Sequence, residues 1–312
     1  MKNIAILLAT YNGGKYIKSL LDSLLNQSYQ NFVCYIHDDG STDDTFEVCR
    51  NYSWRYPEKF RILYYGHCGG AKENFFSMVK NVEEPYLMFC DQDDIWHIDK
   101  IEKSINSIKK EENNNPNKAV LCYSDLKIVD ENLSVIANSY FDFTRKNPKD
   151  LSFSKALIQG FVPGCTFIMN RALYLRLNEY MDLDCIYMHD WWTICLAFAL
   201  GGCVSFISEP LIDYRQHQNN TLGVQKATIF TALKNLFRDV NSGELFRKKR
   251  NWIWRSRNIA GQLLNIDNID PDCKTLCKQL YEIDKKNKIM RILFYIKNFK
   301  GYRGLPYMLF WI

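Results

Sequence analysis

Residues 86–96 read YLMFCDQDDIW, so an apolar segment runs directly into a cluster of acids. The segment 86–89 is short and apolar, which is typical of a buried strand. Three carboxylates follow within four residues. Packed acids repel one another, so they destabilise a fold unless a cation compensates them. A divalent ion that bridges to a substrate diphosphate would do so. An acidic turn that caps a helix is the alternative for so short a motif.

Three strand–loop–helix units precede this cluster. The continuous apolar segment at 4–8 predicts a strand that is buried on both faces, and the segments at 32–36 and 60–65 predict a second and a third strand. The helix after the first strand is indicated by an apolar stripe at helical spacing, formed by Ile17, Leu20, Leu21, Leu24 and Leu25. Repeated β-α units with short loops predict an α/β fold with a parallel, doubly wound sheet and right-handed crossovers.

The polar loops of this part of the chain all follow predicted strands. They cover residues 10–14, 38–43, 67–70 and 91–94. The return loops at 26–31 and 56–59 carry fewer residues suited to binding a ligand. Ligands of doubly wound sheets bind outside the carboxyl ends of the strands, at a topological switch point. The pattern therefore predicts a functional site at that edge of the sheet.

Several function classes are disfavoured. The chain has no GxGxxG after its first strand and no GxxxxGK[ST], which argues against dinucleotide oxidoreductases and P-loop NTPases. A net charge of +5 over 312 residues is too small to indicate nucleic-acid binding. Asp38 or Asp39 could still hold a nucleotide base above the backbone of residues 9–11, with a simple turn role as the alternative.

Composition and the N-terminus predict a cytosolic protein. Eleven cysteines without a CxxC pair, and no signal-peptide pattern, indicate reduced thiols. Scattered cysteines also disfavour structural zinc. No apolar run approaches the roughly 20 residues needed to span a bilayer.

Three motifs carry a resemblance to a known family. TYNG at 10–13, DDGSTD at 38–43 and DQDDIW at 91–96 occur in the order and spacing of family 2 glycosyltransferases of the GT-A fold. The chain is most similar to bacterial polysaccharide and rhamnosyltransferase-like members. The resemblance implies a GT-A catalytic domain at 1–225, with a nucleotide-sugar half at 1–100 and an acceptor half at 101–225. A helical appendage would then occupy 226–312.

The resemblance also implies a donor site. Asp38 and Asp39 would hold the nucleoside, and Asp91 would touch the ribose. The family pattern assigns no role to Asp94, for which we expect capping of the next helix. The implied nucleotide-sugar site comprises Ala9, Thr10, Tyr11, Asn12, Asp38, Asp39, Asp91, Gln92 and Arg215.

Asp93 and His217 are the implied metal ligands. In the segment YRQHQNN at 214–220, the histidine resembles a family residue that completes the metal shell. A carboxylate with an imidazole suits Mn²⁺, while an oxygen-only shell would suit Mg²⁺. Arg215 would be available for phosphate charge.

The segment MHDWW at 188–192 is the second chemical stretch. A carboxylate beside indoles suits a sugar site, because aromatic faces pack on the C–H face of a pyranose. The family pattern places the catalytic base at Asp190, just before a helix predicted at 193–200, and a capping role is the alternative. The expected acceptor-binding residues are Trp191, Trp192 and Gly164, although Gly164 also suits an ordinary turn. His189 need not be catalytic.

The C-terminal part is basic and amphipathic. Residues 285–312 contain seven Lys or Arg and no acid, and Ile289, Ile292, Leu293 and Ile296 line one helical face. Such helices lie on anionic membranes. Packing on the catalytic domain or on a partner is an equal alternative.

Together these features predict an inverting, metal-dependent glycosyltransferase. It would move a sugar from a UDP- or dTDP-sugar to a saccharide acceptor, expected to be lipid-linked, in capsule or O-antigen synthesis at the cytoplasmic face of the membrane. The expected cofactor is Mn²⁺ or Mg²⁺, and no nucleic-acid partner is expected. A non-catalytic nucleotide- or carbohydrate-binding scaffold on the same fold is the alternative.

Overall fold

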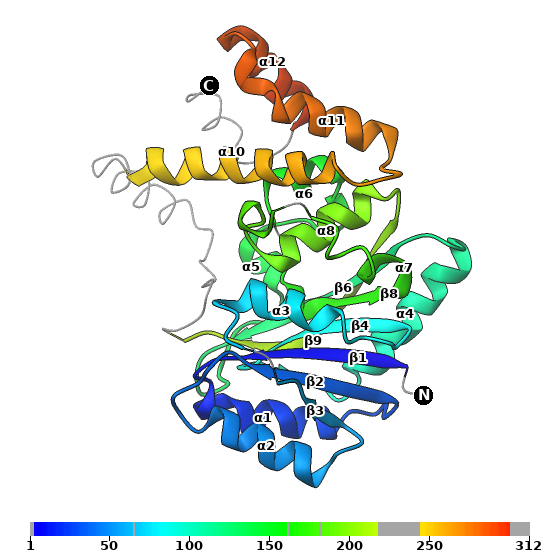
Figure 1. Cartoon of the computed structure of the whole chain (residues 1–312), viewed down its shortest axis with the longest axis vertical. Coiled ribbons are helices and arrows are strands. Elements are labelled where there is room, and N and C mark those ends of the chain that lie inside the picture. The colour runs from blue at the N-terminus through cyan, green and yellow to red at the C-terminus, as the bar shows by residue number, and fades with distance from the viewer. Residues whose placement is uncertain (1–2, 65, 161, 181, 218–243, 300–312) are drawn as a thin grey trace. The chain divides into compact units, whose positions relative to one another are not determined.

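The computed structural model describes residues 3–64, 66–160, 162–180, 182–217 and 244–299 (Figure 1). The chain forms two compact units. The first comprises Met1–Lys149, Val162–Asn178 and Gly202–Lys226, and the second comprises Asp150–Phe161, Glu179–Gly201 and Ala227–Ile312.

A nine-stranded sheet forms the centre of the first unit, in the order β3-β2-β1-β4-β8-β6-β9-β5 with β7 paired to β6. Its strands are β1 Ile4–Thr10, β2 Phe32–Asp38, β3 Phe60–Ile62, β4 Tyr86–Asp91, β5 Ile95–Trp96, β6 Val120–Val129, β7 Val135–Ala137, β8 Phe167–Asn170 and β9 Cys203–Arg215. The helices of this unit are α1 Gly14–Leu25, α2 Thr45–Arg55, α3 Ala71–Val79, α4 Lys100–Asn114, α5 Tyr140–Thr144 and α7 Arg171–Tyr174, with the 3-10 turns η1 Pro148–Asp150 and η2 Gly164–Thr166.

The predicted β-α order of the first hundred residues is confirmed. Residues 4–8 of β1 are fully buried, as expected for a central strand covered on both faces. The apolar stripe of α1 is buried except for Leu25, and α1 and α2 lie on the same side of the sheet (Figure 1). The predicted third strand is shorter than expected, because β3 ends at Ile62.

The switch point lies between β1 and β4. Both β2 and β4 pair with β1 in parallel, so the chain first winds outward through β2 and β3 and then returns to the other side of β1. The register places Asp38 beside Thr10 and Asp91 beside Ala9. The ends of three strands therefore meet at one edge, where ligands of such sheets bind.

The second half of the sheet is mixed rather than parallel. β8 is antiparallel to β4 and β6, β9 is parallel to β6, and β5 is antiparallel to β9. The β5–β9 pairing sets Ile95 opposite Asp213. Because Ile95 directly follows the acidic cluster, this pairing brings the end of β9 to the switch-point edge.

The second unit is helical. It contains α6 Phe153–Ile158, η3 Leu183–Cys185, α8 His189–Ala199, α10 Glu244–Leu263, α11 Pro271–Tyr281, η4 Ile283–Lys285 and α12 Lys288–Asn298. The predicted domain division differs from the observed one, because segments 150–161 and 179–201 group with the C-terminal helices rather than with the sheet. Among the described residues, no helix is long and apolar enough to cross a bilayer.

Trp191 explains why α8 belongs to this helical unit. Its indole Nε1 donates a hydrogen bond to the Ala156 carbonyl at 2.6 Å, and its ring centroid lies 5.2 Å from that of Trp252. A Cβ atom on Gly160 would lie 2.5 Å from the indole Cγ. The indole thus joins α6, α8 and α10.

Replacing Gly160 by Ala should destabilise the protein, because the added methyl group meets the rigid base of the Trp191 side chain. Overpacking of this kind costs about 1–3 kcal/mol. Urea unfolding followed by tryptophan fluorescence measures the change. Gly66→Ala is the matched control, since a Cβ there has no neighbour within 4 Å. Equal stabilities of the two variants would contradict the close packing.

The buried His189 makes stability depend on pH. Burial lowers the pKa of its imidazole from 6.5 to about 3. As the pH falls below 6.5, the unfolded chain therefore takes up a proton that the folded chain does not. Stability should decline by up to about 1.4 kcal/mol per pH unit between 6.5 and 3.

His189→Gln should remove this contribution. Urea unfolding at pH 7.0 and at pH 5.5 measures the slope in both proteins, and the contributions of other titrating groups cancel in the difference between them. A slope that is identical in the variant and the wild type would show that folding does not lower the pKa of His189.

Candidate functional site

The loops after β1, β2 and β4 are fastened to one another at the switch point. The Gln92 amide accepts a hydrogen bond from the Tyr11 N–H and donates one to the Tyr11 carbonyl, both at 2.9 Å. The Asn12 side-chain carbonyl accepts the Thr42 N–H at 2.8 Å. A Cβ atom on Gly13 would lie 2.3 Å from Gln92 Oε1, so a larger residue there would displace the Gln92 amide from its present position. Hydrogen bonds from side chains to backbone groups therefore fix the loops at the rim of the site.

Asp38 organises its own loop. One carboxylate oxygen accepts hydrogen bonds from the Thr10 hydroxyl at 2.9 Å and the Ser41 hydroxyl at 2.6 Å, and the other accepts the Ser41 N–H at 2.8 Å. These bonds link the ends of β1 and β2. Contact of Asp38 with a nucleoside stays a prediction.

Asp39 is 4% exposed and lies under the loop that precedes α3. Its carboxylate accepts the N–H groups of Gly69 at 3.2 Å and Gly70 at 3.0 Å, and it also accepts the Cys68 N–H. Backbone donors hold the carboxylate in one orientation at the switch-point edge. Its role in binding a base likewise stays a prediction.

The structure brings Asp93 and His217 together across 124 positions of sequence. Their Oδ2 and Nε2 atoms are 2.7 Å apart, and their side chains are 16% and 11% exposed. A carboxylate oxygen and an imidazole nitrogen that converge in this way fit a Mn²⁺ or related divalent ion, with the remaining positions left for substrate oxygens and water. The residues present therefore fit the expected metal.

Two further groups of potential ligands occur among the described residues, namely Asp91, Asp94 and Cys165, and His37, Asp39 and Cys68. In the second group, His37 Nδ1 is engaged with the Asn74 amide at 2.8 Å.

Arg215 forms a structural clamp in this fold, and its predicted role in phosphate binding stays a prediction. Its backbone N–H donates to Asp94 Oδ1 at 3.1 Å, its Nε to the Asp93 carbonyl at 2.8 Å, and its Nη1 to the Glu131 carbonyl at 2.7 Å. The residue is 5% exposed. These hydrogen bonds to the acidic loop and to the Glu131 carbonyl fix the position of the guanidinium.

Tyr16 in α1 completes the clamp. Its ring stacks on the His217 imidazole with 4.8 Å between centroids, and the Arg215 guanidinium carbon lies 4.7 Å from the same ring. Sequence reasoning missed Tyr16, since a tyrosine in an ordinary amphipathic helix carries no local signal of this contact.

Asp94 is fully buried and does not cap a helix, contrary to the prediction. Helix α4 begins only at Lys100, after Asp99. Burial raises the pKa of the Asp94 carboxyl well above its usual range, and the neighbouring Asp93 and Asp91 raise it further. The third acid of the motif is therefore part of the core beneath the site.

Lys100 is a buried cation in the same core. Its ammonium donates to the Cys165 carbonyl at 3.0 Å and lies 4.4 Å from the centre of the Trp96 ring. Burial lowers its pKa from 10.5 to about 8. It ties α4 to η2 below the acidic loop.

Asp190 belongs to the second unit, in the first turn of α8. The helix begins at His189 rather than at residue 193, so Asp190 lies inside it instead of capping it. The half-buried carboxylate accepts the Trp191 N–H at 2.6 Å. An acid in a first helical turn is stabilised by the helix dipole. Its role as a base stays a prediction.

The expected acceptor residues are buried. Trp191 is 2% exposed and Trp192 is fully enclosed, so neither indole presents a face to a sugar. Both fill the core of the helical unit, as apolar aromatic side chains do. Gly164 is likewise buried, in the turn η2, where its carbonyl accepts the Phe167 N–H.

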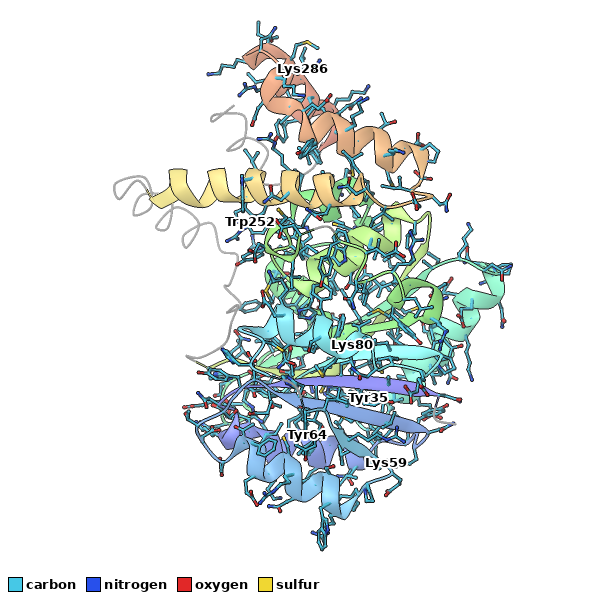
Figure 2. All side chains as sticks on the ribbon, in the orientation of Figure 1. Tyr35, Lys59, Tyr64, Lys80, Trp252 and Lys286 are labelled. Carbon is cyan, nitrogen blue, oxygen red and sulfur yellow. The ribbon has the colours of Figure 1, made fainter. Side chains whose placement is uncertain are left out.

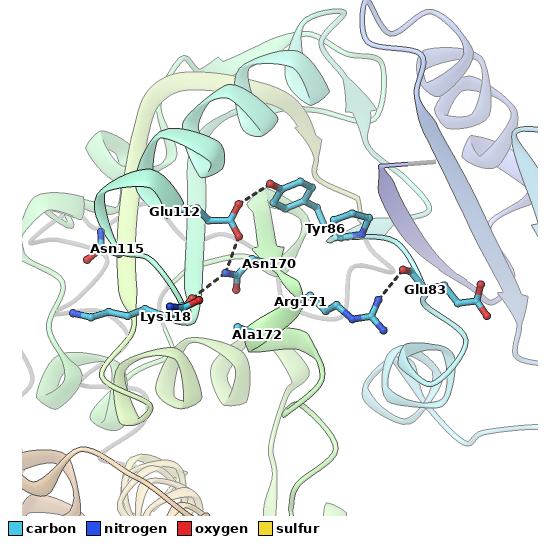
Figure 3. A pocket seen from close by; sticks show the side chains of 10 residues that line it. Glu83, Tyr86, Glu112, Asn115, Lys118, Asn170, Arg171 and Ala172 are labelled. Carbon is cyan, nitrogen blue, oxygen red and sulfur yellow. Dashed lines mark hydrogen bonds between the residues drawn. The ribbon is translucent and has the colours of Figure 1, made fainter. Parts of the chain in front are cut away.

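A separate pocket of about 450 Å³ lies at the opposite, amino edge of the sheet (Figure 3). Glu112 crosses it, accepting hydrogen bonds from the Tyr86 hydroxyl at 2.6 Å and the Asn170 amide at 2.9 Å. Arg171 donates to the Glu83 carbonyl at 2.7 Å. These polar groups satisfy one another, which indicates a structural role.

Arg215→Lys tests the structural role of Arg215, because lysine keeps the positive charge but lacks the planar set of hydrogen-bond donors. Loss of the hydrogen bonds to two backbone carbonyls should cost about 2–4 kcal/mol of unfolding free energy. Arg50→Lys, in an exposed ion pair with Glu47, is the control and should change stability by less than about 0.5 kcal/mol. A stable Arg215→Lys protein would contradict the clamp.

Comparison with known proteins agrees with this architecture. The family model described as "Glycosyl transferase family 2" matches residues 5–176. The chain is 32% identical to the dTDP-rhamnosyl transferase RfbG of Shigella flexneri over 229 residues, which cover 69% of this chain and 73% of that protein. It is 28% identical to the uncharacterized glycosyltransferase RP339 of Rickettsia prowazekii, over 78% and 71% of the two chains.

Two solved structures show the same fold. S. aureus TarS 1–349 in complex with UDP-GlcNAc matches with a TM-score of 0.60 and 17% identity, over 99% of this chain and 78% of that one. The mannosyltransferase PcManGT from Pyrobaculum calidifontis, in complex with GDP-Man and Mn²⁺, matches with a TM-score of 0.53 and 15% identity, over 98% and 78% of the chains. The chain therefore belongs to glycosyl transferase family 2, and it is a glycosyltransferase with the GT-A fold.

Proposed function

We propose that this glycosyltransferase is an inverting, metal-dependent enzyme that transfers a sugar from a UDP- or dTDP-sugar to a saccharide acceptor. The single observation that carries the proposal is the convergence of Asp93 and His217, 2.7 Å apart. The adjoining register sets Asp91 beside Ala9 at the switch point. A carboxylate and an imidazole at this position suit a divalent ion on a sugar diphosphate.

The choice of donor rests on the relatives and on the rim of the site. The relative from Shigella flexneri is a dTDP-rhamnosyl transferase, and the TarS structure holds UDP-GlcNAc. The bases of these donors, uracil and thymine, carry an N–H group that would donate a hydrogen bond to the fixed carboxylate of Asp39. Asp91 would bind the ribose, and the backbone of residues 9–12, held by Gln92, would line the nucleoside.

Asp93 and His217 would hold the cofactor, Mn²⁺ or Mg²⁺. The PcManGT structure contains Mn²⁺ together with its donor. When a divalent ion is bound there, negative charge that grows on the leaving nucleoside diphosphate is neutralised. Arg215 and Tyr16 would keep the imidazole opposite the carboxylate, and Arg215 would also be available for phosphate charge.

Asp190 would act as the general base. It would remove a proton from the acceptor hydroxyl while that oxygen attacks the anomeric carbon from the face opposite the diphosphate, which inverts the configuration. General-base assistance contributes about 10²–10⁴-fold in rate. The neighbouring His189 has its pKa lowered to about 3 by burial, so at neutral pH it adds no positive charge that would weaken the base.

The acceptor would be a lipid-linked saccharide in capsule or O-antigen synthesis, at the cytoplasmic face of the membrane. The rhamnosyl transferase relative and the basic C-terminal sequence support this proposal.

The test combines donor binding with turnover. UDP- and dTDP-sugars are screened for Mn²⁺-dependent binding by calorimetry and for slow hydrolysis, first with the wild-type protein. Asp93→Asn should lose the metal-dependent part of donor binding. Asp190→Asn should keep donor binding within about twofold and lose about 10²–10⁴-fold in transfer or hydrolysis.

Asp272→Asn is the matched control, because Asp272 is an exposed acid in the first turn of α11 of the same unit. It should leave both quantities unchanged. Wild-type protein that shows no metal-dependent hydrolysis with any donor would instead be a binding scaffold. Equal losses of binding and turnover in Asp190→Asn would make Asp190 structural.

A further inference from the structure

Helix α12 has an inner face that is anchored in the helical unit. Tyr295 and Phe299 are each 1% exposed, and their rings pack 5.6 Å apart. Arg291 fastens the start of the helix, because its guanidinium donates to the carbonyls of Asp284 at 2.7 Å and Lys286 at 2.8 Å. The orientation of the helix about its own axis is therefore determined.

The outer face of α12 is apolar and open to solvent. The exposed fractions are 69% for Ile289, 50% for Met290, 55% for Leu293 and 44% for Ile296. Residues 289, 293 and 296 follow helical spacing, so they form one stripe along the helix. Single exposed apolar residues are ordinary, but a contiguous stripe of large aliphatic side chains marks an interaction surface.

Positive charge surrounds this stripe. Lys285, Lys286, Lys288 and Lys297 are all exposed (Figure 2 labels Lys286). The sequence has no acid from 285 onward, so no carboxylate of the helix itself neutralises them, and within the described residues only Lys285 of the four has an acidic neighbour, Glu282 at 3.4 Å. An apolar stripe flanked by lysines is complementary to a partner that has an apolar interior and a negatively charged surface.

We propose that the outer face of α12 lies on an anionic lipid surface, with the aliphatic stripe between the headgroups and the lysines against their charges. An amphipathic helix parallel to the bilayer buries its apolar face in this way, and anionic headgroups add attraction for each nearby lysine. The proposal deepens the proposed function, since it specifies how an enzyme with a lipid-linked acceptor reaches the membrane.

The elements that precede α12 in the chain connect it to α10. Arg257 on α10 forms an ion pair with Asp284 in η4 and donates to the Tyr281 carbonyl at 3.1 Å. The ring of Tyr281 would lie 2.8 Å from a Cβ atom on Gly261. These contacts join η4 and α11 to α10, and Arg291 of α12 donates to the Asp284 carbonyl, so lipid binding at α12 would hold the helical unit at the surface through η4.

The test uses the full-length protein and vesicle sedimentation. One set of vesicles contains phosphatidylcholine alone, and the other contains about a third phosphatidylglycerol. The wild-type protein should bind the anionic vesicles, and binding should weaken as salt screens the charges. Leu293→Ser with Ile296→Ser, and separately Lys286→Glu with Lys288→Glu, should each weaken binding at least tenfold.

Controls match each change elsewhere in the chain. Trp54→Ser removes an apolar side chain that is 86% exposed on α2, and Lys109→Glu with Lys110→Glu reverses two exposed charges on α4. Both should leave vesicle binding unchanged. Thermal unfolding and donor hydrolysis should match the wild type in all four variants, which separates lipid binding from folding and from the active site.

The proposal is overturned if the wild-type protein ignores vesicles, binds neutral and anionic vesicles equally, or binds them equally well after the α12 substitutions. Light scattering that shows a wild-type dimer and a Leu293→Ser, Ile296→Ser monomer, with unchanged vesicle binding, would assign the face to a second copy. Absence of donor hydrolysis in the wild-type protein would count against the proposed function and leave the vesicle result standing.

Discussion

The hydrogen bonds of Arg215 are the constraint on which the rest of the site depends. They attach the last residue of β9 to the acidic loop after β4, through the Asp93 carbonyl and the Asp94 carboxyl, and to the Glu131 carbonyl. His217 follows two residues later and meets Asp93 only because this attachment fixes its starting point. Tyr16 then limits the rotation of the imidazole by stacking on it.

The three acids of the motif at 91–94 do not share one environment. Burial raises the pKa of Asp94 well above its usual range, and the neighbouring Asp93 and Asp91 raise it further. The ammonium of Lys100 lies in the same core, beneath the loop. The motif therefore combines a buried structural acid, Asp94, with two acids that stay partly exposed at the rim, Asp91 and Asp93.

The motif at 188–192 shows how the composition of a ligand site and that of a packed core can coincide. The motif at 188–192 combines an acid with two indoles, which is also the composition of many sugar sites. In the structure both indoles are core residues, Trp191 joins α6, α8 and α10, and Asp190 is half-buried at the start of its helix. Packing, rather than ligand contact, accounts for the aromatic residues.

The sequence by itself determined the order of strands and helices in the first hundred residues and the edge at which the polar loops collect. Both follow from local periodicity, because a buried parallel strand is a continuous apolar run and its loop comes next in the chain. It did not reveal β9, whose burial is irregular, whose sequence contains Pro210 and whose pairing with β6 shifts register near Asp125.

Only the tertiary structure decided which distant residues meet. The contacts of Asp93 with His217, of Tyr16 with Arg215 and of Trp191 with Gly160 join positions that are 31 to 199 residues apart. The burial of Asp94 and Trp192 likewise depends on what packs above them. Local sequence carries no record of such contacts, since they arise from strand register and helix packing, which are determined by the whole chain at once.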